Sequence, residues 1–307
     1  MNHRRRGNTM YRFIVALLLS VPLVVFAAAD SRPDLLEVLE INGEITDNTA
    51  SQVRTNVETI ADNAKVKAVL LVVKSPGGGV LAVADVYHTL SKLKVPVVGW
   101  CDGICASGGT YVLMAPSVKY IAMTDEAING SVGVVMQSMR FDRLLNALYI
   151  DSEVFKSGSL KVAGNPIQKM TDEERKYLQS LIDDFAQTFY AVVKRARPQI
   201  TDWDAVKSAR VFVGVKAVQV GLADAIARKD EAIAKAKELS GSKSIFTREE
   251  LKKMSRVADD RAIYRTPVLQ PRVENAPHGD IAWLIETLKE IRSGQSVRFS
   301  YRLPMEF

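Results

Sequence analysis

Ser107 stands between an apolar run and two glycines in the stretch Trp100 to Ala115, WCDGICASGGTYVLMA. The apolar run is typical of a buried strand, and the residues after Ser107 predict a short helix that ends before Pro116. A serine at such a turn lies near the unpaired N–H groups that begin a helix, which favour developing negative charge. This geometry suits a nucleophilic serine, although an ordinary tight turn with a capping serine uses the same residue types.

A second glycine turn, SPGGG at residues 75–79, lies between the apolar run Val66 to Val73 and a helical pattern from Val80 to Leu93. Consecutive glycines can point several backbone N–H groups into one concavity, which is the form of an oxyanion site. An open α/β sheet builds its sites from turns at the carboxyl ends of its strands. The two glycine turns therefore predict one shared site.

A serine nucleophile needs a proton acceptor, and the chain offers only three histidines. His3 lies in the N-terminal basic stretch, His278 lies among prolines, and His88 reads as an ordinary helix residue. Lysine is the alternative base, provided that burial in an apolar site lowers its pKa from about 10.4. Lys156 and Lys161 both flank a Gly/Ser loop, and the residues alone do not choose between them.

The chain has two cysteines, Cys101 and Cys105, on the predicted strand that leads to Ser107. In an extended strand their Cα atoms would be about 13 Å apart, too far for a disulfide, although a turn at residues 102–103 would bring them together. The favoured interpretation is a pair of small buried hydrophobes. Cys105 is also a minor rival to Ser107 as the nucleophile.

Strand and helix patterns alternate from residue 35 to residue 123, which predicts a mostly parallel α/β sheet with right-handed crossovers. Later in the chain, Thr171 with Glu174 forms a capping box for a long helix that reaches about Arg197. Its apolar stripe predicts a core or subunit contact, and it comprises Tyr177, Leu178, Leu181, Ile182, Phe185 and Phe189.

Composition excludes several classes of protein. The chain has 307 residues with 47% hydrophobic and 25% charged residues, which indicates a globular protein of one large or two small domains. The net charge is +6, but four of the cations are Arg4, Arg5, Arg6 and Arg12, which precede the first acid, Asp30. With no basic face bearing interleaved aromatics, nucleic acid is not an expected partner. No metal-ligand cluster or nucleotide fingerprint is visible, so no cofactor or metal is expected.

The first 29 residues predict an export signal. A basic stretch to Arg12 precedes the apolar run Phe13 to Ala29, which ends in small residues suited to cleavage. At about 17 residues the run is at the short limit for a membrane-spanning helix, so a cleaved signal and a retained anchor both fit. Either would leave the body outside a bacterial cytoplasm, periplasmic or anchored to the inner membrane and facing outward.

Five motifs occur in a fixed order: SPGG, ASGG, NGSVGVVM, FKSGSLK and ARVFVGVKAVQVGLAD. Together they resemble the signal peptide peptidase A (protease IV) family, the S49 serine peptidases, from about Leu39 to Ala225. The resemblance implies a crotonase/Clp-protease-like spiral of ββα units. It places a peptidase domain at residues 30–240. Residues 241–307 then form a C-terminal helical extension, in which we expect a linker, an amphipathic helix and a short strand.

The resemblance also implies roles for individual residues. Ser107 corresponds to the nucleophile, Lys161 to the general base, and Ser131 to the serine that orients the lysine. The backbone N–H groups of Gly78 and Gly108 correspond to the oxyanion hole.

One departure from the family lies at Thr110, where an aromatic residue usually follows the two glycines, and it puts the shape of the substrate pocket in doubt. The implied function is an exported serine endopeptidase with a Ser/Lys dyad that degrades cleaved signal peptides or other membrane-associated peptides. The single copy of the domain implies a ring-like homo-oligomer. Alternatives are a stomatin-operon-type peptidase acting on one protein partner, an acyl-CoA enzyme of the crotonase type, and a non-catalytic scaffold.

Overall fold

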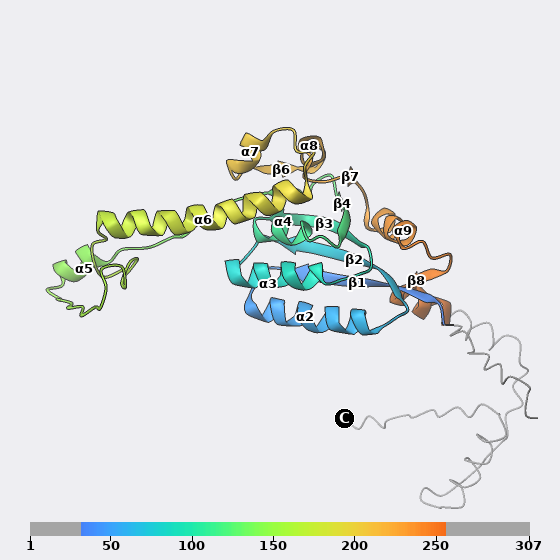
Figure 1. The fold of residues 1–307 in the computed structure, drawn as a ribbon, viewed down its shortest axis with the longest axis horizontal. Helices are drawn as coiled ribbons and strands as arrows, with labels where there is room; N and C mark the ends of the chain where they lie inside the picture. The colour runs from blue at the N-terminus through green and yellow to red at the C-terminus, as the bar shows by residue number, and fades with distance from the viewer. Residues whose placement is uncertain (1–31, 256–307) are drawn as a thin grey trace, which may run out of the picture. The chain divides into compact units, whose positions relative to one another are not determined.

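The computed structural model describes residues 32–255, in which eight strands form one sheet (Figure 1). Their order is β6-β5-β3-β2-β1-β8, and β4 pairs with β3 and β7. Only the pairing of β5 with β6 is antiparallel among the described strands. The predicted α/β sheet is therefore confirmed. The strands are β1 (Asp34–Asn42), β2 (Val66–Ser75), β3 (Val97–Ala106), β4 (Val118–Met123), β5 (Ile128–Gly130), β6 (Val211–Val213), β7 (Ala225–Ile226) and β8 (Ile245–Thr247).

Strand β3 pairs with β2 along one edge and with two strands in succession along the other. Its first half, from Val97 to Cys101, pairs with β4, and its end, from Ile104 to Ala106, pairs with β5. Between these halves the backbone turns at Gly103, whose φ of 94° suits glycine. The partner strand on this edge therefore changes from β4 to β5 along β3, an arrangement that fits a spiral of ββα units.

Apolar side chains cover both faces of the central strands, as expected for parallel strands that are buried on both sides. On β2, Val69, Leu71 and Val73 belong to the larger core cluster, while Leu70 and Val72 face a smaller cluster on the opposite side that includes α9. The helices are α2 (Asp47–Asp62), α3 (Val80–Ser91), α4 (Gly108–Leu113), α5 (Asp142–Ala147), α6 (Asp172–Ala196), α7 (Trp203–Lys207), α8 (Gly214–Val220) and α9 (Lys229–Ser240).

Helix α6 begins at the predicted capping box. The Thr171 hydroxyl accepts from the Glu174 N–H at 3.1 Å, and the Glu174 carboxylate accepts from the Thr171 N–H at 2.8 Å. Near its C-terminal end, Phe189, Val192 and Val193 are buried in the core. Figure 1 shows α5 at the opposite, N-terminal end of α6, beyond the sheet. Residues 134–171, which we call the arm, connect β5 to α6.

Two local expectations differ from the structure. Cys101 and Cys105 form a disulfide, with Cα atoms 5.9 Å apart, so the interpretation as two free buried thiols is wrong. The turn at Gly103 within β3 shortens the distance that an extended strand would impose. In addition, residues 152–155 of the arm form no strand.

Strand β8 pairs with β1, so the sheet continues beyond the boundary predicted at residue 240. After β8, residues 248–255 are helical, and Thr247 and Glu250 cap this helix reciprocally. No helix within residues 32–255 is long and apolar enough to cross a membrane. The predicted export segment at 1–29, and the helix and strand expected late in the tail, lie outside the described residues.

Candidate active site

The backbone at Ser107 makes a sharp turn between β3 and α4. Its φ of 54° and ψ of −118° are unusual for a residue with a side chain, and such backbone persists only where neighbouring contacts hold it. Two contacts do so: the Ser107 N–H donates to the Gly130 carbonyl at 2.8 Å, and the Ser107 carbonyl accepts from the Tyr111 N–H at 2.9 Å. The side chain is only partly exposed. Ser107 therefore has the geometry predicted for a nucleophile at a strand-to-helix turn.

The two glycine turns meet at Ser107. A Cβ atom built on Gly77 would lie 2.7 Å from the Gly108 nitrogen and 3.1 Å from the Ser107 Oγ. A Cβ atom on Gly108 would lie 3.3 Å from the Gly78 nitrogen. The absence of side chains at these positions is what allows the two backbones to approach so closely. The structure thus brings Ser107, Gly108 and Gly78 together, as predicted.

The Gly78 N–H points away from Ile45, the residue that bridges to the glycine turn. Ile45 donates to the Gly77 carbonyl at 2.8 Å and accepts from the Gly79 N–H at 3.2 Å. In this parallel bridge, the N–H of the intervening Gly78 faces the opposite side. The Gly108 N–H begins α4, where helical N–H groups have no partner within the helix. Both N–H groups can therefore serve an oxyanion formed beside Ser107.

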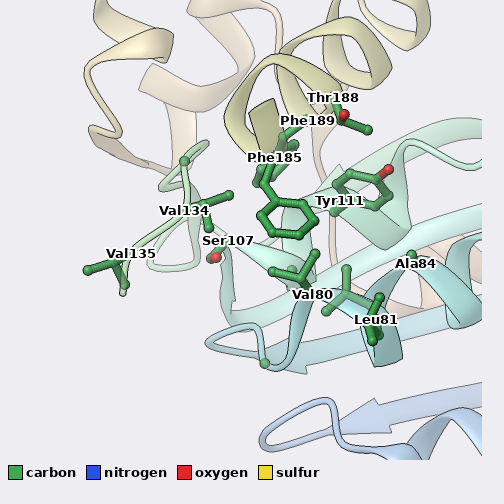
Figure 2. Close-up of a pocket in the computed structure, with 14 residues that line it drawn as sticks. Val80, Leu81, Ala84, Ser107, Tyr111, Val134, Val135, Phe185, Thr188 and Phe189 are labelled. Carbon is green, nitrogen blue, oxygen red and sulfur yellow. The ribbon is translucent and has the colours of Figure 1, made fainter. Parts of the chain in front are cut away.

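An apolar cavity of about 280 Å³ opens beside Ser107. Figure 2 shows side chains from α3, α4, α6 and the start of the arm gathered around it. Its size and lining suit an apolar side chain or a small apolar group. The lining includes Val80, Leu81, Tyr111, Val134, Phe185 and Phe189.

Tyr111 gives the cavity a neutral polar group. Burial raises the pKa of the Tyr111 phenol, nearby Tyr87 raises it further, and Arg195 partly opposes the rise. Arg195 also donates to the Tyr87 hydroxyl at 3.2 Å. Because Tyr111 stays protonated at neutral pH, it contributes no charge to the cavity.

Ser131 is connected to the nucleophile by one backbone hydrogen bond. It directly follows Gly130, whose carbonyl accepts from the Ser107 N–H. Its own N–H donates to the Arg210 carbonyl at 3.0 Å, and its φ is 52°. The structure therefore places Ser131 beside Ser107, although Ser131 is not among the residues that line the cavity.

Lys161 lies elsewhere in the same chain, exposed on the arm. The segment around it packs on the first turns of α6, where Ser159 Oγ lies 3.4 Å from a Glu173 carboxylate oxygen. Between Glu173 and Phe185, which lines the cavity, the helix rises about 18 Å. A single chain therefore does not bring Lys161 to Ser107.

Lys156 is held on the same part of the arm. Its Nζ donates to the Ser159 carbonyl at 2.9 Å and lies 3.9 Å from a Glu174 carboxylate oxygen. Lys156, the other candidate base, thus contacts the arm and the start of α6. The ring of His88, on α3, contacts the Tyr87 ring edge-on, with their centroids 5.3 Å apart, and His88 does not line the cavity.

Two features of the site differ from what the sequence predicts. Thr110, expected to reshape a substrate pocket, does not line the cavity and is fully buried, with its hydroxyl against the Gly130 carbonyl. Phe185 and Phe189 line the cavity, although their stripe predicted only a core or subunit contact. The 3.6-residue period of apolar residues identifies the apolar face of a helix, but it does not indicate which other element that face packs against. Cys105 is disulfide-bonded and buried, which removes it as a rival nucleophile.

The chain resembles proteins of known families. The family model of peptidase family S49 matches residues 89–243, and that of Clp protease matches residues 32–128. A protein of Enterococcus faecium that carries the name signal peptide peptidase SppA is 32% identical over 212 residues, which are 64% of this chain and 60% of that protein. A protein of Synechocystis named as a protease is 31% identical over 206 residues, 66% of this chain and 73% of that protein.

A solved structure of a mutant of 1510-N, a membrane-bound stomatin-specific protease, has a TM-score of 0.45 and 18% identity, covering 70% of this chain and 98% of that one. The chain spans 60% of the length of the Enterococcus relative. The Clp protease match agrees with the spiral of ββα units seen along β3.

Proposed function

Because the chain belongs to peptidase family S49 and is a serine peptidase, we propose that it is an exported endopeptidase that uses Ser107 as its nucleophile and Lys161 as its base. The observation that carries this proposal is the meeting of the two glycine turns at Ser107. A nucleophile and two backbone N–H donors are then already in place before substrate binds.

The chemistry follows from these positions. Ser107 Oγ attacks the carbonyl carbon of a peptide bond while its proton passes to the neutral Lys161 amine, and the Gly78 and Gly108 N–H groups stabilise the oxyanion. As the tetrahedral intermediate collapses, the C–N bond breaks and the lysine returns the proton to the leaving amine. Water, deprotonated by the same lysine, then attacks the ester carbonyl. The bond from the carbonyl carbon to Ser107 Oγ breaks, the lysine returns the proton to Oγ, and the acid product leaves. Ser131 orients the lysine amine.

The base is proposed to come from a second copy of the chain. In one chain Lys161 lies on the arm, at the end of α6 remote from the cavity. The arm also exposes a row of large apolar side chains, which a neighbouring copy would cover. This supports a ring-like homo-oligomer in which the arm of one copy reaches the Ser107 of another. The exposed side chains are Val135, Met136, Met139, Phe141, Leu144, Leu148, Tyr149, Ile150, Phe155 and Ile167.

The cavity supports a substrate with an apolar side chain before the scissile bond. Its walls are aliphatic and aromatic, and Tyr111 is uncharged there. Cleaved signal peptides and other membrane-derived peptides are rich in such residues, so we propose them as the substrate class.

Export is supported by the disulfide. Disulfides persist in oxidising compartments and are rare in the cytosol, and Cys101 is bonded to Cys105. Together with the basic and apolar first 29 residues, this favours a periplasmic location or an outward-facing anchor in the inner membrane.

The test is hydrolysis of a fluorogenic peptide with leucine before the scissile bond by the full chain purified in detergent. Ser107→Ala and Lys161→Ala should each abolish hydrolysis, and Lys156→Ala, the matched control on the same arm, should retain it. Activity that survives Ser107→Ala would refute the mechanism.

Mixing the two inactive variants tests where the base comes from. After subunit exchange, a mixture of Ser107→Ala with Lys161→Ala should regain activity, because one copy then supplies an intact serine and another an intact lysine. A mixture that stays inactive, although native mass spectrometry shows mixed oligomers, would argue that both groups act within one chain.

A further inference from the structure

Thr110 is the third residue of α4 and is fully buried. Its hydroxyl oxygen lies 2.8 Å from the Cys105 carbonyl, 2.8 Å from the Gly130 carbonyl and 3.0 Å from the Asn129 Oδ1. It also accepts from the Gly130 N–H at 3.1 Å. One side chain thus contacts the end of β3 and two of the three residues of β5.

A hydroxyl has one proton and two lone pairs. It can accept from the Gly130 N–H and donate to one neighbouring oxygen at a time. Because this position is closed to water, no solvent molecule can replace these bonds if the hydroxyl is lost. The position of Gly130 therefore depends on Thr110.

Gly130 is also the residue that holds the nucleophile. Its carbonyl accepts from the Ser107 N–H at 2.8 Å, and Ser131 follows it directly. On its other side it pairs with Val211 of β6, and a Cβ atom there would lie 2.5 Å from the Arg210 carbonyl oxygen, so the two backbones lie too close for any side chain at this position. Gly130 is thus held between β6 and the Thr110 hydroxyl, and the Ser107 N–H is hydrogen-bonded to the Gly130 carbonyl.

From these contacts we infer that Thr110 is a positioning residue of the active site, an inference that rests on the proposed function. Its hydroxyl fixes Gly130, Gly130 fixes the unusual backbone of Ser107, and the Ser107 Oγ is thereby aimed at the substrate carbonyl. Thr110 touches neither substrate nor reacting atoms, so its effect passes entirely through the backbone of β5.

The experiment compares Thr110→Val, which keeps the shape and removes the hydroxyl, with Thr110→Ser, which keeps the hydroxyl. Thr89→Val is the matched control, because Thr89 is also a buried threonine but lies at the far end of α3, away from Ser107. Hydrolysis of the leucine peptide gives kcat and KM for the full chain. The rate at which a fluorophosphonate probe labels Ser107 gives a second readout that needs no peptide substrate.

Thr110→Val is expected to lower kcat about 10- to 100-fold, the scale that a misplacement of up to about 1 Å produces. KM should change little, labelling should slow in parallel, and Thr110→Ser should restore most of both. Thr89→Val should keep wild-type kcat. If Thr110→Val does not fold, Thr110→Ala provides the same comparison, and circular dichroism and size-exclusion profiles establish which variants are folded.

A folded Thr110→Val that keeps wild-type kcat and labelling rate would overturn the inference. So would rapid amide exchange at Gly130 in the wild type, a measurement that depends on no variant. If wild-type Ser107 is labelled but cleaves no peptide, the proposed function fails while the labelling comparison still decides the role of Thr110.

Discussion

The rings of Tyr111 and Phe189 lie 4.9 Å apart between centroids and are tilted by 59°. Tyr111 is one helical turn beyond Ser107, and Phe189 is buried near the C-terminal end of α6. The helix that carries the arm at one end is therefore attached, at the other end, next to the nucleophile.

Phe189→Ala should destabilise the fold by about 3–5 kcal/mol, as for other buried phenylalanines. The neighbouring Phe185→Ala is the control, because that ring is 40% exposed and Phe189 is 4% exposed. Both rings line the cavity, so both variants should raise KM for the leucine peptide, but Phe185→Ala should cost little stability. Urea unfolding and peptide kinetics measure the two effects. Equal losses of stability in both variants would contradict this division.

Gly77→Ala should reduce hydrolysis by about 10²–10³, the scale of losing an oxyanion donor. Its φ is 108°, and the added methyl would lie 2.7 Å from the Gly108 nitrogen. Gly79→Ala is the matched control in the same turn, because its φ is −62° and no atom lies within 4 Å of the added methyl. Comparison of kcat in the two folded variants checks the prediction, which a similar kcat for both would contradict.

Replacement of both Cys101 and Cys105 by alanine should lower the free energy of unfolding by about 2 kcal/mol, as loop entropy predicts for so short a loop. Reductant should shift the wild-type urea midpoint toward that of the double variant and leave the variant unchanged. Alkylation followed by mass spectrometry should find no free thiol before reduction. Two alkylated cysteines in the unreduced protein would contradict the disulfide.

Glu250 gives a prediction about pH. Burial alone would raise the pKa of Glu250, but hydrogen bonds from Lys237 and from the Thr247 N–H lower it below its ordinary value. A lowered pKa means that the ionised form stabilises the fold at neutral pH, and that this contribution is lost as pH falls through the acidic range.

Because the pair is partly exposed, Glu250→Gln should cost no more than about 1 kcal/mol at pH 7. The difference from wild type should disappear well below the ordinary glutamate pKa of about 4.3. Urea unfolding at several pH values measures it. A difference that persists undiminished at the acidic end would argue against an electrostatic origin.

Several features could be predicted because they depend on local sequence. The capping box at Thr171 and the glycine turns around Ser107 are encoded within a few residues, so helix α6 and the oxyanion geometry were both expected. The alternation of strand and helix patterns likewise indicated the parallel sheet.

Other features depend on contacts between distant segments. The disulfide requires the turn inside β3, which strand spacing alone does not indicate. Strand β8 is only three residues long and forms because β1 leaves an edge beside it. The position of Lys161 is set by packing of the arm on α6. The family motifs identify Lys161 as the base, but they do not indicate whether it acts on the Ser107 of its own chain or on that of another copy.

The pairing of β3 with β4 and then with β5 along one edge limits which insertions and deletions this chain can tolerate. Cys101 is in register with Met123 of β4, and Cys105 with Asn129 of β5, so the four-residue spacing between the cysteines is fixed by strand pairing at both of its ends. An extra residue in this interval would turn Ser107 to the opposite face of its strand. Length changes are therefore expected to accumulate among the exposed residues of the arm, and not in the strand that ends at the nucleophile.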